Sequence, residues 1–286
     1  MDFKIRIVRT PRLLQAVAGI FMRENGIDGG LASMLEMEPE VKKLLISHGI
    51  ITASLKLLDR PFGYTCYEYY RQLCTPNEFD QLLLQAARNR RVILDLCCGA
   101  GATIHALLPL QPQIIYGFDY NADQIHLLRS LIAEIDDYRG TRVVTEIADA
   151  HQTGLEDASV DLVVCRVSLH YLNEKRALKE AARVLRPNGA VFLLVHGSGY
   201  LYDYVISRRG LLSGSLWKSM VVHSARYNQE QRRGQRFGAH FITQRFLRRA
   251  LVTSGFRNIR MVTSGKWMRL GILPVYYAAI AERGEG

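Results

Sequence analysis

Two glycines and a carboxylate stand close together at one end of a short apolar run. The run Val92–Leu96 is apolar except for Asp95, and Gly99 and Gly101 follow it directly. Glycines in such a loop allow a positive φ and let a bound ligand approach the backbone. A helix that begins after the loop would turn its positive end toward an anionic group. The segment therefore predicts a ligand-binding loop between a strand and a helix.

The spacing of the glycines distinguishes between the ligands that such a loop could bind. A loop for a nicotinamide dinucleotide has the pattern GxGxxG, but the third glycine position here is Ile104. A Walker phosphate loop would continue with Gly-Lys and then Ser or Thr, and no such sequence follows Gly101. Both ligands are therefore disfavoured.

The loop belongs to a stretch in which short apolar runs alternate with helical spacing. Expected strands and helices, in chain order, are Val92–Leu96, Gly101–Leu108, Ile114–Phe118, Ala122–Glu134, Arg142–Ile147, Val160–Cys165, Glu174–Val184, Ala190–Val195, Thr243–Ser254, Asn258–Thr263 and Val275–Ala281. Alternation of this kind predicts βαβ units, and hence a parallel sheet with helices on both faces. We expect an α/β fold with a seven-stranded, mostly parallel, doubly wound sheet.

Polar residues also follow the other strands, at the edge where parallel sheets bind ligands. Asp119 ends the second strand, and its carboxylate could bind both hydroxyls of a ribose or cap the next helix. Asp149 and Ala150 follow the third strand, and Arg166 follows the fourth. The segment Arg183–Gly189 supplies a proline and a glycine for a turn before the fifth strand.

In this order and at these positions, the motifs resemble class I S-adenosylmethionine-dependent methyltransferases, and within them the broad small-molecule branch. The resemblance covers about Val92–Val195 and rests on VILDLCCGAGATIHAL, YGFDYN, the acid after the third strand and RVLRPNG. The family's loop pattern is acid-x-Gly-x-Gly-x-Gly. Here it consists of Asp95, Cys97, Gly99 and Gly101, so a cysteine replaces the first glycine.

This resemblance implies S-adenosylmethionine as the cofactor, bound along the ends of the strands. It implies that the loop backbone faces the methionine part, that Asp95 orients the ammonium group, that Asp119 binds the ribose and that Asp149 lies near the adenine amine. An aromatic residue of the N-terminal unit would close over the cofactor. The complete expected cofactor-binding set is Asp95, Cys97, Gly99, Gly101, Asp119, Tyr120, Asp149, Ala150, Cys165 and Tyr67.

Methyl transfer is an in-line displacement at a sulfonium, which depends mainly on alignment in a dry pocket. A general base is needed only if the acceptor has a proton to lose. His196 and His170 follow the fifth and fourth strands and are the candidate catalytic residues, although either can be structural. The candidate substrate-binding residues are Arg166, Tyr70, His223 and His240.

Residues 1–90 precede the sheet and are expected to form an N-terminal helical cap. Helical spacing covers Arg12–Arg23 and Pro39–Leu58, and Arg60–Gly63 is expected to end the second helix. The segment Thr75–Glu78 predicts the start of a further helix that is capped by Thr75. Residues 91–286 would form the methyltransferase domain, with a basic insertion at about 197–241 after the fifth strand.

Composition narrows the class of protein. The chain has 286 residues, of which 48% are hydrophobic and 22% charged, as in ordinary globular proteins. It contains no run of about 18 apolar residues, so no transmembrane segment is expected. The five cysteines are odd in number and two are adjacent, which favours a reducing compartment, the cytoplasm. The chain lacks CxxC and HExxH motifs, so no metal site is predicted.

The net charge of +10 comes from one segment. Residues 205–270 contain 14 Lys and Arg against one acid, which is +13, and the remainder of the chain carries −3. Three interpretations are open: a solvated face, recognition of an anionic small molecule by inward arginines, or docking of RNA, an acidic carrier protein or a membrane surface. Arg245, Arg248 and Arg249 share one helix face, which supports a patch but specifies no partner.

The sequence thus predicts an S-adenosylmethionine-dependent methyltransferase of a small metabolite, for which an anionic molecule is one interpretation. No Asn/Asp-Pro-Pro-aromatic motif follows the fourth strand, where Cys165–Ser168 stands, and this disfavours amino-methylation of bases. Two alternatives remain open. One is a methyltransferase of RNA or of a carrier-bound substrate. The other is a non-methylating protein on the same fold, such as a cyclase or a binding module.

Overall fold

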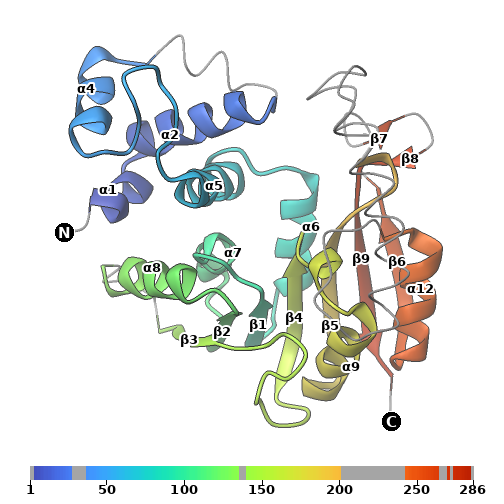
Figure 1. Ribbon diagram of the computed structural model, residues 1–286. Helices are drawn as coiled ribbons and strands as arrows, with labels where there is room; N and C mark the ends of the chain where they lie inside the picture. Colours follow the sequence, from blue (N-terminus) through green and yellow to red (C-terminus); the bar gives the residue numbers. More distant parts are fainter. Residues whose placement is uncertain are drawn as a thin grey trace.

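A seven-stranded sheet forms the centre of the computed structural model, which describes residues 3–27, 37–134, 140–200, 242–263, 269–270 and 273–284 (Figure 1). Its strands are β1 (Val92–Leu96), β2 (Ile114–Asp119), β3 (Arg142–Ile147), β4 (Val160–Arg166), β5 (Leu185–His196), β6 (Phe256–Val262) and β9 (Tyr276–Arg283). Their order is β3-β2-β1-β4-β5-β9-β6. The strands from β3 to β5 pair in parallel, and β9 is antiparallel to both of its neighbours. The predicted fold is confirmed.

The direction of strand order reverses between β1 and β4. From β1 the chain proceeds outward through β2 to β3, and then returns to place β4 on the other side of β1. All five residues of β1 are buried, because both faces of a central parallel strand are covered. The carboxyl ends of β1 and β4 therefore open onto the crevice in which ligands of such sheets bind.

Helices cover the sheet and begin at the predicted residue or one residue later. These are α7 (Ala102–Leu107), which continues into the 3₁₀-helix η2 (Leu108–Leu110), α8 (Ala122–Ala133), α9 (Glu174–Val184), which follows the 3₁₀-helix η3 (Leu169–Tyr171), and α12 (Gln244–Thr253). Side chains of Asn121, Asn173 and Thr243 accept backbone hydrogen bonds at the starts of α8, α9 and α12. Two short strands, β7 (Arg269–Leu270) and β8 (Leu273–Pro274), form a separate pair.

The N-terminal residues form a helical unit above the strand ends in the view of Figure 1. Its elements are α1 (Phe3–Arg9), α2 (Pro11–Glu24), α4 (Pro39–Ser47), α5 (Arg60–Tyr69), the π-helix η1 (Tyr70–Cys74) and α6 (Glu78–Ala87). Buried apolar side chains of this unit share a core cluster with Ala100, Ala102 and Leu131, so the unit packs on the β1–α7 loop and on α8. Phe79 and Leu83 of α6 belong instead to a core cluster of the sheet.

Three local predictions in this unit are wrong. The helix predicted over Pro39–Leu58 ends at Ser47, because Gly49 takes a φ of +63° and the chain then turns so that Ile51 bridges to Leu57. The segment Arg60–Gly63 starts α5 and does not end a helix. Asp59 accepts a hydrogen bond from the Phe62 backbone, and Pro61 suits the first turn.

The third correction concerns the start of α6. Asn77, and not Thr75, caps this helix, because its Oδ1 accepts hydrogen bonds from the backbone N–H groups of Phe79 and Asp80. Asp80 completes the capping box with a bond of 2.7 Å from the Asn77 N–H to its Oδ2. The residue that completes the box is thus Asp80, which also forms an ion pair with Arg166.

Two sequence expectations about the whole chain concern membranes and metals. Within the described ranges, no helix combines the length and apolar character that a bilayer span requires. The same ranges contain no group of three or more His, Cys, Asp or Glu side chains that could hold a metal ion. Most of the predicted basic insertion, from residue 201 to residue 241, lies outside the described residues.

Candidate active site

A cavity of about 320 Å³ lies at the carboxyl ends of β1, β2 and β4. The loop after β1 forms its floor, α5 and η1 form its opposite wall, and Asp119 and Arg166 close its sides. Its volume falls in the range of small-molecule and cofactor sites. The cavity therefore coincides with the edge of the sheet at which the sequence places a ligand.

The loop between β1 and α7 is held in a left-handed backbone conformation. Cys97, Gly99 and Gly101 have φ values of +60°, +54° and +85°. Gly101 suits this position through its φ, and a Cβ added there would lie 2.3 Å from Leu128 Cδ1, so the Leu128 side chain would have to move. The Cys98 N–H donates to the Phe118 carbonyl over 3.0 Å and ties the loop to β2.

Two residues without the freedom of glycine adopt positive φ beside the cavity. Cys97 follows β1, and the β-branched Val167, with a φ of +53°, follows β4. Strained backbone of this kind persists where the surrounding structure imposes it, and it gathers at functional sites. The Val167 N–H donates to the Leu194 carbonyl over 2.7 Å, which holds it in place.

Substitution of Cys97 tests this strain. We expect Cys97→Gly to change the free energy of unfolding by less than about 1 kcal/mol, because relief of the left-handed strain offsets the added freedom of the unfolded chain. Cys97→Val is expected to destabilise by about 1–2 kcal/mol relative to cysteine, because a β-branched side chain fits this region poorly. Urea unfolding of both variants measures the difference, and equal stabilities would contradict the assigned backbone conformation.

Asp95 is a buried carboxylate with an unsatisfied atom. Its side chain lines the cavity, the residue is 2% exposed, and its Oδ2 has no hydrogen-bond partner among the described residues. Burial, and secondly the charge of Asp119, raise the pKa of Asp95 to about 8 although Arg166 opposes the shift. A buried acceptor atom without a hydrogen bond costs free energy unless a bound ligand donates to it. A cationic donor would form the strongest hydrogen bond with this carboxylate.

Asp119, at the end of the adjacent strand β2, also lines the cavity and supports the loop. Its Oδ2 accepts a hydrogen bond of 2.8 Å from the Gly99 N–H, and its Oδ1 accepts one of 2.8 Å from the Asn121 N–H. Each carboxylate oxygen can accept a second hydrogen bond, so a ligand hydroxyl can still bind here. The structure therefore uses Asp119 for local support and leaves acceptor capacity toward the cavity.

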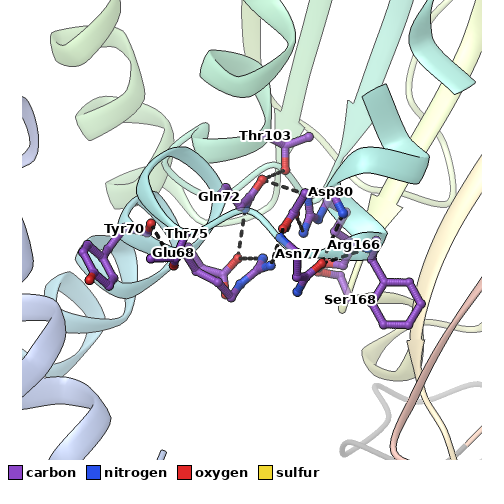
Figure 2. A network of polar contacts seen from close by, with 11 residues as sticks. Glu68, Tyr70, Gln72, Thr75, Asn77, Asp80, Thr103, Arg166 and Ser168 are labelled. Atoms are coloured by element: carbon purple, nitrogen blue, oxygen red, sulfur yellow. Dashed lines mark hydrogen bonds and ion pairs between the residues drawn. The ribbon is translucent and has the colours of Figure 1, made fainter. Parts of the chain in front are cut away.

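A buried ion network joins the end of β4 to the helical unit, as Figure 2 shows. Arg166 donates to Asp80 Oδ1 over 2.6 Å and to Gln72 Oε1 over 2.9 Å. The contacts span 86 and 94 residues of sequence and fix η1 and α6 against β4. Arg166 Nε is buried without a hydrogen-bond partner among the described residues.

The same network reaches the cavity wall through Glu68. Arg71 donates to Glu68 Oε2 over 2.8 Å, and Gln72 donates to it over 3.0 Å. Burial alone would raise the pKa of Glu68, but Arg71 and the hydrogen bonds hold it below its usual value. Glu68 is therefore an ionised carboxylate at the cavity.

Two further hydrogen bonds attach α5 to the cavity floor. The Tyr69 hydroxyl donates to the Ala100 carbonyl over 2.7 Å, and the Thr65 hydroxyl donates to Gln124 Oε1 over 3.2 Å. The chain then passes from α-helix to π-helix at Tyr70, a feature that recurs at functional sites. The wall formed by α5 and η1 is thus fixed to the loop, to α8 and to β4.

The structure brings together some of the residues that the sequence singles out and separates others. Asp95, Cys97, Gly99, Asp119 and Arg166 all line the cavity. The following expected cofactor residues are outside its lining: Gly101, Tyr120, Asp149, Ala150, Cys165 and Tyr67.

The reasons for the separation differ from residue to residue. Tyr120 is 64% exposed. Asp149 accepts hydrogen bonds from the backbone and the imidazole of His151. The ring of Tyr67 stacks on Phe21 at 5.5 Å, within the helical unit.

The two histidines proposed as catalytic bases pack against each other and not into the cavity. His170 and His196 have ring centroids 4.2 Å apart, and His196 stacks on Tyr200 at 3.8 Å. Both histidines are buried. Tyr70 packs against the core of the helical unit. His223 and His240 lie outside the described residues.

Sequence reasoning missed most of the cavity wall. The missed lining residues of α5 and η1 are Pro61, Thr65, Glu68, Tyr69 and Gln72. Their spacing of three and four residues is that of one helix face, and three of the five are polar. This periodicity could have indicated that these residues share one face of a helix that lines the site. The aromatic content of the stretch drew attention to Tyr67 and Tyr70, which point elsewhere.

Comparison with known proteins agrees with this geometry. A family model described as a methyltransferase domain matches residues 93–189, which contain the loop, Asp119 and Arg166. The strand order, the loop after β1 and this match define a class I S-adenosylmethionine-dependent methyltransferase domain. S-adenosylmethionine is the cofactor of this class.

Individual relatives show how far the similarity extends. An uncharacterized methyltransferase of Schizosaccharomyces pombe is 32% identical over 102 residues, which are 36% of this chain and 38% of that protein. The 27-O-demethylrifamycin SV methyltransferase of Amycolatopsis mediterranei is 34% identical over 110 residues, 36% of this chain and 39% of that protein. The chain thus matches less than half the length of these two curated relatives.

Among solved structures, a SAM-dependent methyltransferase of Methanosarcina mazei has the same fold. Its TM-score is 0.52 at 18% sequence identity, and the match covers 72% of this chain and 98% of that one.

Proposed function

We propose that this protein transfers the methyl group of S-adenosylmethionine to a small metabolite. The observation that carries the proposal is Asp95, which lines the cavity and whose buried Oδ2 has no hydrogen-bond partner among the described residues. An ammonium group is the donor that such an atom lacks. When bound, S-adenosylmethionine supplies an electrophilic methyl group on a sulfonium.

The charges of the cavity support a cationic ligand. Asp95, Asp119 and Glu68 line it, and the cationic side chain in its lining, Arg166, is already paired with Asp80. The positive-φ loop at Cys97 and Gly99 brings backbone close to the cavity, so a ligand can lie against it. We assign the ammonium group to Asp95 and the ribose hydroxyls to Asp119.

The wall formed by α5 and η1 has the role of excluding water and aligning the acceptor. Thr65, Tyr69 and Gln72 anchor this wall to the loop and to β4, and so keep the cavity shape constant. Alignment in a dry site is the main requirement of methyl transfer. The lining contains no histidine among the described residues, so Glu68 is the group placed to orient a proton-bearing acceptor.

A small acceptor is supported by one relative. The Amycolatopsis relative is a 27-O-demethylrifamycin SV methyltransferase, and it matches this chain over a similar domain length. For an anionic acceptor, the binding group would be Arg166 Nε, which is buried and unpartnered in the described part of the chain.

Calorimetric titration of the full chain with S-adenosylmethionine tests the first step, and labelled methyl donor with metabolite extracts tests the second. Heat of binding together with a methylated product is the expected result. Absence of heat at micromolar protein and millimolar ligand would contradict the proposal. Binding without any methylated product would instead indicate a non-methylating protein on this fold.

Replacement of Asp119 tests the ribose assignment. Asp119→Ala is expected to weaken cofactor binding by roughly 1.5–3 kcal/mol, the range for hydrogen bonds to charged groups. Asp119→Asn keeps an oxygen for the Gly99 N–H, so it should preserve the loop and still weaken binding. Asp123→Ala, at an exposed acid in the first turn of α8, is the matched control. Unchanged affinity in both Asp119 variants would refute the assignment.

A further inference from the structure

The outer faces of α9 and α12 form one strongly basic surface. Helix α12 packs against α9 and β6, away from the helical unit (Figure 1). The exposed side chains of the two helices include six cations, which we call the basic helix pair: Lys175, Arg176, Lys179, Arg245, Arg248 and Arg249. Four of the six are arginines. None of the six lines the cavity.

Acidic side chains on these helices do not neutralise the surface. Helix α12 has no acid, and the two acids of α9, Glu174 and Glu180, are 2% and 7% exposed. Across the described ranges, none of the six cations forms an ion pair. Asp149 lies near Arg176, but its carboxylate is bonded to His151. Arg248 donates to the Ile259 carbonyl over 3.4 Å, a contact that leaves its charge uncompensated.

The apolar side chains of the two helices point inward. Those that are buried are Ala177, Leu178, Ala181 and Val184 of α9 and Leu247, Ala250 and Leu251 of α12. Val252, at 60% exposure, is the large apolar side chain that these helices expose in the described structure.

A helix that lies on a membrane needs a broad exposed apolar face. A tight protein interface needs buried aromatic or aliphatic anchors. The surface offers neither.

We propose that the basic helix pair binds the phosphodiester backbone of a nucleic acid. Guanidinium groups match phosphate oxygens with two parallel hydrogen bonds, and three arginines of α12 repeat at helical spacing on one face. A polymer with regularly spaced phosphates can meet several of these cations at once. Because α9 and α12 themselves expose no aromatic ring for base stacking, the contact is with the backbone and independent of base sequence.

This docking surface is separate from the methyl-transfer site. It makes no assumption about the methyl acceptor, and cofactor binding does not depend on it. Failure of the nucleic-acid proposal would therefore leave the proposed methyltransferase activity intact. Failure of the methyltransferase proposal would likewise leave the proposed nucleic-acid binding intact.

Fluorescence anisotropy of the full chain with labelled single-stranded RNA, an RNA hairpin and a DNA duplex tests the inference. Between about 50 and 200 mM salt, log affinity should fall with log salt at a slope of about −3 to −5, as for four to six phosphate contacts. Comparison of the RNA and DNA arms identifies the source of the phosphates. Absence of binding at about 50 mM salt, or stronger binding to polyglutamate or anionic vesicles, would overturn the inference.

Neutralisation of one helix face localises the contact. The triple variant Arg245→Gln/Arg248→Gln/Arg249→Gln should weaken binding about tenfold or more at low salt and reduce the slope by about 2–3. The control is Lys43→Gln/Lys56→Gln/Arg88→Gln, which removes the same charge at exposed sites elsewhere. Equal loss in both triples would show that net charge alone is responsible, and would refute the assignment. Thermal unfolding and S-adenosylmethionine calorimetry confirm that each triple remains folded.

Discussion

Asp95→Asn is expected to weaken the binding of S-adenosylmethionine by roughly 10- to 150-fold at pH 8, which corresponds to 1.5–3 kcal/mol. The amide keeps the shape of the side chain but has no negative charge for the ammonium group. Asp123→Asn removes an equal charge at an exposed position and should leave affinity within about twofold, because exposed charges interact weakly through solvent. Isothermal titration calorimetry measures all three proteins.

The pH dependence of binding gives a second test of the same residue. With a pKa of about 8 in the ligand-free protein, Asp95 holds a proton at neutral pH, and a cation can bind only as that proton leaves. Affinity of the wild type should therefore rise with pH, by up to about tenfold per unit between roughly pH 6 and 7.5, before the α-amino group of the ligand, with a pKa of about 8, begins to lose its proton. The Asp95→Asn variant should lack this slope. An identical slope in both proteins would assign the proton to another group.

Stability should change in the opposite direction from binding. The folded-state pKa of Asp95 lies above its unfolded value of about 4, so between about pH 4 and 8 the folded state binds more protons and loses stability as pH rises. Asp95→Asn removes this penalty and should stabilise the ligand-free protein by about 1–3 kcal/mol at pH 8, and little at pH 4. Urea unfolding checks this. Lower stability together with weaker binding would indicate simple structural damage.

Arg166→Met is expected to lower the free energy of unfolding by about 3 kcal/mol. Its guanidinium is buried between Asp80 and Gln72, and its removal leaves the Asp80 carboxylate buried with Arg71, at 3.4 Å, as its remaining cation in the described network. Methionine fills much of the same volume, so the decrease in the free energy of unfolding measures the contribution of the charge and its hydrogen bonds. Chemical denaturation of the full chain provides the measurement.

A double variant distinguishes an electrostatic effect from a packing effect. Arg166→Met/Asp80→Asn removes both charges and should recover about 1–3 kcal/mol relative to the sum of the single losses. Arg166→Lys keeps the charge but cannot hold Asp80 and Gln72 together, so it should remain clearly less stable than the wild type. Strict additivity in the double variant would show that the ion pair does not carry the stability.

The predicted sheet, its strands and the loop at Asp95–Gly101 depend on local information. Runs such as Val92–Leu96 and Val160–Cys165 are mostly apolar, with one aspartate each, because central parallel strands are buried on both faces. Glycine at positive φ and asparagine at the helix starts act within a few residues of themselves. These features could therefore be recognised from the chain alone, and so could the carboxylates at the strand ends.

The partners of those side chains were not predictable in the same way. His170 and His196 lie at the ends of neighbouring strands, as expected, yet their rings pack against each other, His196 also stacks on Tyr200, and neither residue lines the cavity. A position at the end of a strand determines the edge of the sheet but not the direction of the side chain. Tyr67 likewise stacks on Phe21 and is outside the cavity lining, because its position on α5 differs from that of the lining residues Tyr64 and Glu68.

The sequence by itself therefore determined the α/β sheet, the loop after β1 and the positions of Asp95 and Asp119, since each follows from local periodicity and turn chemistry. The resemblance of its motifs to a known family indicated the class of domain and its cofactor. Only the tertiary structure decided the opposite wall of the site and the role of Arg166. That wall depends on ion pairs and hydrogen bonds from Arg166 to Asp80 and Gln72, across 86 and 94 residues. Contacts at such separations form when α5, η1 and α6 pack onto the sheet, and no local pattern encodes them.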